Sequence, residues 1–134
     1  MVKKLEEAGL TLGKNLFYFE DPQGSHSYLS WRQQVVNHLI LFCGIRKNDI
    51  AVDSLTVEEE CIPSESRPGK IYKRVNPIAT LRNGVKCSVM NNVEYILPNE
   101  NQVDQYGNLM CDSSFTLEYI YKTISGTKYI QCCK

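Results

Sequence analysis

A chain of 134 residues, 43% hydrophobic and 22% charged, has the size and composition of one globular domain. Lys plus Arg equals Asp plus Glu at 15 each, so no overall field attracts nucleic acid or an anionic membrane. The longest apolar run, 39–43, is far shorter than the ~20 residues that a helix needs to cross a bilayer. We therefore predict a single domain over 1–134 that binds no membrane, and nucleic acid is disfavoured as its partner.

The first part of the chain carries short, weak signals. Residues 2–9 are compatible with two helical turns, which are too short to be stable alone. The apolar run at 16–19 is expected to form a short strand or a clamp on the core. A turn is then predicted at 21–24, where Asp, Pro and Gly follow one another.

The segment 27–45 predicts the main helix, at about 27–43. Ser30 and Gln33 have the spacing of a capping box, in which each side chain satisfies a free N–H at the helix start. Apolar residues recur at steps of three and four and so line one side of a helix: Tyr28, Trp31, Val35, Leu39 and Phe42. Gly44 is suited to ending the helix, with Ile45 folding back on it. We expect the apolar side to be buried against a sheet.

Beyond Gly44 the sequence pattern is typical of strands. The first strand is expected within 50–57, followed by an exposed loop at 61–70 that contains two prolines and a glycine. Strands are also expected at 71–72 and 78–81, with Pro77 marking a sheet edge or a bulge between them.

The remaining strands are predicted from turn residues. Asn83-Gly84 indicates a type I′ hairpin turn that joins 78–81 to 85–90, because both residues tolerate positive φ. Weaker turns are predicted at Asn91-Asn92 and Ser125-Gly126, and a long loop at 98–108. The strands following these turns are expected at 93–97, 115–122 and 128–133, and alternation is clearest at Phe115, Leu117, Tyr119 and Tyr121. The predicted fold class is therefore α+β, with one main helix packed on an antiparallel, meander-like sheet of five or six strands.

No arrangement of residues in the sequence predicts a catalytic site. His38 and Cys43 are five apart on the helix and so do not face each other, and a helix C-terminus raises a thiol's pKa. We expect Cys43 to be a small buried hydrophobic residue. His26, just before the helix, is better explained by turn and cap chemistry than by a serine hydrolase. The protein is thus expected not to be an enzyme, with a small hydrolase kept as a remote alternative.

Six cysteines stand at positions 43, 61, 87, 111, 132 and 133. None forms the C-x₂₋₄-C pair of a structural zinc site, so we predict no metal and no cofactor. The adjacent Cys132 and Cys133 point to opposite faces of a strand, and one of them could bridge to Cys111 or Cys87. No signal peptide is recognised at the N-terminus, which favours an intracellular or virion location with reduced thiols. Oxidised cysteines would instead indicate a secreted protein.

Two features suggest a partner-binding surface. Basic residues flank Tyr72 and resemble a single-strand nucleic-acid platform, but pairing with the Glu run at 58–60 explains them equally well. Tyrosines are plentiful in the C-terminal half, where they would suit an exposed contact face. The weak candidates for partner binding are Arg67, Lys70, Tyr72, Lys73, Arg74, Tyr106, Tyr119 and Tyr121.

These observations leave two main hypotheses of function. The first is a non-enzymatic interaction or assembly protein, such as a small viral or phage subunit, that binds another protein or itself. The alternative is a secreted effector or inhibitor domain stabilised by disulfides. The number of free thiols separates the two.

Overall fold

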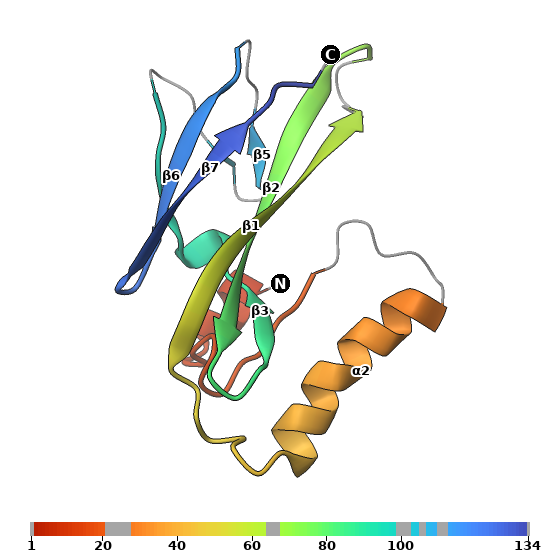
Figure 1. Cartoon of the computed structure of the whole chain (residues 1–134), viewed down its shortest axis with the longest axis vertical. Coiled ribbons are helices and arrows are strands. Elements are labelled where there is room, and N and C mark those ends of the chain that lie inside the picture. Colours follow the sequence, from red (N-terminus) through yellow and green to blue (C-terminus); the bar gives the residue numbers. More distant parts are fainter. Residues whose placement is uncertain are drawn as a thin grey trace. The chain divides into compact units, whose positions relative to one another are not determined.

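The computed structural model describes residues 2–20, 28–63, 68–98, 103–104, 107–109 and 113–133, with the side chains of 28–33 and Asn91 left aside. The described residues form a mixed structure with few helices and seven strands in two sheets, whose recorded strand pairs are antiparallel (Figure 1). The predicted α+β class is thus confirmed in its general form.

Contacts within the chain divide it into two compact units. The first comprises Met1–Leu55 and Ile78–Val89, and the second comprises Thr56–Pro77 and Met90–Lys134. Two of the three boundaries between the units fall inside strands, namely β1 (Val52–Pro63) and β2 (Ile71–Leu81), and the third lies between Val89 and Met90. The single domain over 1–134 remains a prediction.

The first unit contains α1 (Val2–Glu7), α2 (Tyr28–Cys43) and the β2–β3 hairpin, with β3 at Lys86–Ser88. The hairpin has the predicted position, since Ala79 pairs with Cys87. Its turn differs, because only Gly84 has positive φ (91°), and the Gly84 N–H donates to the Leu81 carbonyl at 2.7 Å. This geometry matches a type I turn followed by a left-handed glycine, in place of the predicted type I′ turn.

The outer edge of β3 is covered by the N-terminal segment that contains Tyr18 and Glu20. The Ser88 N–H donates to the Tyr18 carbonyl at 2.7 Å, and the Ser88 hydroxyl accepts a hydrogen bond from the Glu20 N–H at 2.9 Å. The aromatic run at 16–19 therefore leads into a clamp along β3, one of the two roles expected for it. The core of this unit is formed by Val2, Leu12, Ile78, Ala79, Leu81, Val85, Cys87 and Val89.

Strand β2 continues through Pro77, which was expected to mark an edge or a bulge. On one side β2 pairs with β3 at 78–80 and with β5 (Asn108–Leu109) at 73–74. Pro77 lies between these two stretches, so its missing N–H removes no bond from either pairing. Pro77 is consequently tolerated in a fully buried position.

The second sheet has the strand order β4-β6-β7, with β4 at Glu94–Ile96, β6 at Phe115–Tyr121 and β7 at Ile124–Ile130. The predicted alternation in β6 is confirmed, because every second residue from Leu117 to Tyr121 is buried. The turn predicted at Asn91-Asn92 is instead a 3-10 helix, η1 (Met90–Asn92), and β4 pairs with β6 and not with β3.

The turn predicted at Ser125-Gly126 is also wrong. Tyr121 pairs with Ile124, so the hairpin turn falls three residues earlier, at Lys122 and Thr123, and Lys122 has φ 55°. Gly126 lies inside β7 opposite Tyr119, and a Cβ added at Gly126 would be 2.7 Å from the Tyr119 ring. The glycine thus serves close packing against an aromatic ring rather than a turn.

Candidate interaction surface

Helix α2 is attached to its unit by an amide. The Asn37 side chain donates to the Lys86 carbonyl and accepts from the Lys86 N–H, both at 3.0 Å. Lys86 lies in β3, two residues before Ser88. Like those of Ser88, its backbone N–H and carbonyl face away from β2. Asn37 therefore occupies the strand edge where a neighbouring strand would otherwise bind.

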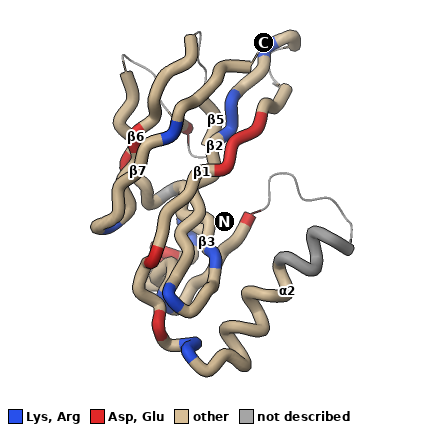
Figure 2. Tube along the Cα trace, in the orientation of Figure 1, with Lys and Arg blue, Asp and Glu red and all other residues tan. Residues whose placement is uncertain are grey.

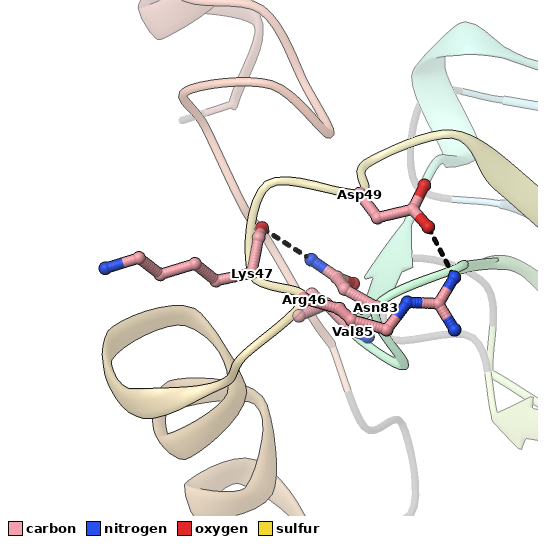
Figure 3. Close-up of polar contacts among 5 residues, drawn as sticks. All are labelled: Arg46, Lys47, Asp49, Asn83 and Val85. Carbon is pink, nitrogen blue, oxygen red and sulfur yellow. Dashed lines mark hydrogen bonds and ion pairs between the residues drawn. The ribbon is translucent and has the colours of Figure 1, made fainter.

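A second attachment follows the helix and is drawn in Figure 3. The Asn83 side-chain amide donates to the Lys47 carbonyl at 3.0 Å. The Asn83 N–H also donates to the Asp49 carbonyl at 3.0 Å. Arg46 and Asp49 form an ion pair of 2.6 Å across the same loop. The hairpin turn thereby holds the segment that connects α2 to β1.

The side of α2 away from these attachments is apolar and exposed. At 3.6 residues per turn, Asn37, Ile40 and Leu41 share one side of the helix. Val35, Leu39 and Phe42 lie on the other side, with fractional exposures of 46%, 57% and 75%. Val36 flanks them at 50%. We call these four residues, Val35, Val36, Leu39 and Phe42, the apolar face of α2.

This finding corrects the prediction that Val35, Leu39 and Phe42 are buried under a sheet. Trp31 belongs to the side chains that are not described. Ile45 is fully exposed and Gly44 does not have positive φ, so the expected helix ending is also wrong. The apolar residues are exposed because the helix contacts its unit through the opposite side, which carries Asn37. The sequence pattern does not single out that side.

A shallow groove lies between α2 and the N-terminal segment. Its volume is about 200 Å³, and it is lined by Phe17, Tyr18, Phe19, Gln34, Asn37, His38, Leu41 and Lys86. Pockets for drug-sized ligands usually have ~300–1,000 Å³, so this groove is small for such a role. His38 donates through Nδ1 to the Gln34 carbonyl at 3.0 Å.

The thiol of Cys43 was expected to be buried, but it is exposed and free. Its position in the helix places it near the apolar face and away from Asn37. The other histidine considered, His26, lies outside the described residues.

The basic residues near Tyr72 pair with the Glu run at 58–60, which is one of the two explanations proposed for them. Lys73 lies 3.6 Å from Glu59, and Arg74 lies 3.8 Å from Glu60. Figure 2 shows these blue and red segments on neighbouring strands. Because Lys73 is buried, its charge is committed to this pairing and does not form an open platform.

The other candidates for partner binding differ in their exposure. Tyr119 and Tyr121 are 6% and 4% exposed, so the structure corrects their assignment to an exposed contact face. They point inward because β6 alternates, and their rings fill the interior. Tyr72 is half-buried and Lys70 is exposed, while Arg67 and Tyr106 lie outside the described residues.

A disulfide joins Cys61 to Cys133, with the two Cα atoms 5.9 Å apart. Cys132 is also disulfide-bonded, and the other predicted candidate, Cys111, lies outside the described residues. Cys87 is not part of a disulfide and is 1% exposed, which corrects its assignment as a bridging residue, because it packs in the core of the first unit. Cys61 was missed because the prolines around it indicated a loop, whereas it lies near the end of β1.

The apolar face was missed as a surface, although a signal for it exists. Described residues of α2 are apolar on both sides, since Ile40 and Leu41 lie opposite Leu39 and Phe42. A helix with apolar residues on two opposite sides has two surfaces that suit a contact. The sequence therefore indicates two contact surfaces, whereas the predicted packing on a sheet accounts for only one.

Among the described residues there is no group of three or more metal-ligating side chains, and no helix is long and apolar enough to span a membrane. Comparison with known proteins matched no family model, no curated protein and no solved structure.

Proposed function

We propose that the protein is a non-enzymatic interaction protein that binds another protein chain through the apolar face of α2. The exposure of Val35, Leu39 and Phe42 on one side of a helix is the observation that carries this proposal. Single exposed apolar residues are common on protein surfaces, whereas a contiguous group marks an interaction site.

The energetics favour binding at this face. Burying a Val, Leu or Phe side chain completely is worth ~1.5–3 kcal/mol each, and these side chains are 46% to 75% exposed. A partner that covers them gains part of this free energy. The attachments through Asn37 and Asn83 fix the helix backbone, so less conformational entropy is lost on binding.

The exposed thiol of Cys43 allows a direct test. A thiol-reactive photo-cross-linker attached to the native, unreduced protein will label Cys43, while Cys87 is buried and the Cys61–Cys133 bond is closed. Irradiation in an extract of the source cells should then give a defined protein adduct. Leu39→Glu should abolish this adduct, whereas Ile96→Glu, on an exposed residue of β4, should leave it intact. An adduct that is equally strong with Leu39→Glu would refute the proposal.

A second candidate function is favoured by the disulfide between Cys61 and Cys133 and by the bonded state of Cys132. Structural disulfides persist in oxidising compartments, which supports a secreted effector or inhibitor domain. Alkylation of the denatured, unreduced protein followed by peptide mapping tests this candidate. Labels on Cys43 and Cys87 but not on Cys61, Cys132 and Cys133 would support it, and labels on all of these residues would reject it.

A further inference from the structure

We propose that the groove between α2 and the N-terminal segment binds a nucleotide, with the phosphate held by Lys14 and Lys47 and the base against the aromatic residues at 17–19. The groove lies on the side of α2 that carries Asn37, opposite the apolar face. It is therefore a second site, separate from the surface of the proposed function. Its volume, its charge and its aromatic wall support this inference.

The groove adjoins a second hollow. This hollow has a volume of about 300 Å³ and is lined by Lys14, Phe17, Leu41, Lys47, Asn48 and Ile50. Phe17 and Leu41 also line the groove of about 200 Å³, so the two spaces share a wall. Together they fall in the range of ~300–1,000 Å³ that small-molecule sites usually occupy. All of the lining residues belong to the first unit.

The charged side chains that line the two spaces are lysines. Lys14 and Lys47 line the second hollow and Lys86 lines the groove, whereas no Asp or Glu is among the described lining residues. Figure 3 shows the Lys47 side chain extending away from the turn at Asn83. None of the three lysines has an ion-pair partner in the described part of the chain. An anion that enters here therefore meets unpaired positive charge.

The described carboxylates next to the lining residues in sequence have partners of their own. Glu20 accepts a hydrogen bond from the Tyr18 hydroxyl at 2.8 Å, and Asp49 pairs with Arg46 at 2.6 Å. The chain as a whole is neutral, so the attraction of an anion depends on this local excess of lysine. Such an attraction acts over about 10 Å at ordinary salt concentrations.

The two lysines of the second hollow match a phosphate in charge. A phosphate monoester carries about −1.5 to −2 charges at pH 7, which two ammonium groups balance. Lysine is a common phosphate ligand, because its ammonium group acts as a compact point charge. A carboxylate carries a single charge and would leave one of the two ammonium groups unbalanced.

The aromatic residues provide a wall for a planar ring. Phe17, Tyr18 and Phe19 all line the groove and are half-buried. Any base gains stacking energy against such side chains, since every base has a π-face. The Gln34 side chain and Nε2 of His38 supply polar groups for the edge of the base, while Nδ1 of His38 donates to the Gln34 carbonyl. A phosphotyrosine ring would leave these polar groups unused, so a nucleotide is favoured.

A free nucleotide and the end of a single strand present the same chemical groups. Lys86 separates these two sources, because it lines the groove but not the second hollow. It is placed for a further phosphate, which a strand has and a mononucleotide lacks.

An NMR titration of the unreduced full chain with adenosine 5′-monophosphate tests the site. Amide signals should shift at 14–19, 34–41 and 47–50, and those of β6 and β7 should not. The double variant Lys14→Gln with Lys47→Gln should bind at least about tenfold more weakly, since two charge-assisted hydrogen bonds are lost. Lys3→Gln with Lys4→Gln is the matched control, because it removes the same charge from exposed lysines of α1, and it should bind like the native chain.

A series of ligands tests the role of the base. Ribose 5-phosphate lacks the base and should bind at least about fivefold more weakly than adenosine 5′-monophosphate. Phe17→Leu keeps an apolar side chain in the wall and should reduce this difference. A 5′-phosphorylated oligonucleotide that binds more tightly than the mononucleotide, and that Lys86→Gln weakens, would identify a single strand as the source. Equal affinities would identify the free nucleotide.

Four outcomes would overturn the inference. The first is a native spectrum that does not shift up to ~10 mM adenosine 5′-monophosphate, a concentration above a millimolar Kd. The second is equal weakening by the Lys3 and Lys4 control. The third is inorganic phosphate or ribose 5-phosphate binding as tightly as the nucleotide, and the fourth is tighter binding of phosphotyrosine.

Discussion

Tyr95 couples the stability of the second sheet to pH. It lies in β4 opposite Tyr119 of β6, and its hydroxyl donates to the Met90 carbonyl at 3.4 Å. Burial raises the pKa of Tyr95 above the value of an exposed tyrosine, because the phenolate would lose its hydration. The native state therefore keeps the Tyr95 proton at a pH where the unfolded chain releases it.

We expect Tyr95→Phe to reduce the loss of stability at alkaline pH. With the native pKa raised, the contribution of Tyr95 is complete below the unfolded pKa of ~10 and is lost as the pH rises beyond it. The loss approaches ~1.4 kcal/mol per pH unit for one group. Urea unfolding of both proteins between pH 8 and pH 11 measures the difference. Parallel stability curves for the two proteins would show that Tyr95 ionises normally in the native state.

Asn37 holds α2 through two hydrogen bonds to one backbone position. Asn37→Ala should lower the free energy of unfolding by ~1–2 kcal/mol, since each net hydrogen bond is worth ~0.5–1.5 kcal/mol. It should also speed hydrogen exchange at the Lys86 amide, which then loses its acceptor. Gln34→Ala, one turn earlier on an exposed position, is the control and should change neither quantity. Unchanged exchange at Lys86 would mean that the helix is held in another way.

At the scale of elements, the bond between Cys61 and Cys133 ties the end of β1 to the segment that follows β7. The two cysteines are 72 residues apart in sequence, so the bond restricts a large loop in the unfolded chain. A restriction of this kind typically stabilises a protein by ~2–4 kcal/mol.

The double variant Cys61→Ala with Cys133→Ala should accordingly unfold at a lower urea concentration under non-reducing conditions, by an amount equivalent to ~2–4 kcal/mol. Cys43→Ala is the control, because Cys43 is free and exposed, and it should leave the unfolding midpoint unchanged. Addition of a reductant should lower the stability of the native protein at least to that of the double variant, because it also opens the disulfide of Cys132. If the reductant has no effect on the native protein, the two thiols are not joined.

Local elements of this chain were largely predictable from the sequence, for identifiable reasons. The helix at 28–43 follows from its apolar spacing, the hairpin at Gly84 from its turn glycine, and β6 from strict alternation. Each of these signals lies within a few residues of the structure that it specifies. The signal for the strand that pairs with β4 is not local in this way. Strand β6 is about twenty residues away, and nothing near Asn91-Asn92 indicates that β4 pairs with β6 and not with β3.

The candidate site was harder to predict than the fold. An apolar stripe shows that Leu39 and Phe42 need a contact, but it does not say whether that contact lies within the chain or on another one. The attachment of the opposite side depends on Asn37, a polar residue whose partner, Lys86, is 49 residues away. Exposure and pairing are properties of the whole molecule, and the local pattern does not contain them.

The central claim concerns the whole molecule: α2 shows its apolar face to the solvent and not to the protein's own core. The measurement that tests it most directly compares the free energies of unfolding of Leu39→Ala and Leu117→Ala in dilute, monomeric protein. Leu117 is fully buried and its truncation should cost ~2–5 kcal/mol. Leu39 is 57% exposed, so its truncation should cost less than ~1 kcal/mol. Equal losses for the two variants would place Leu39 in the core and contradict the interaction surface.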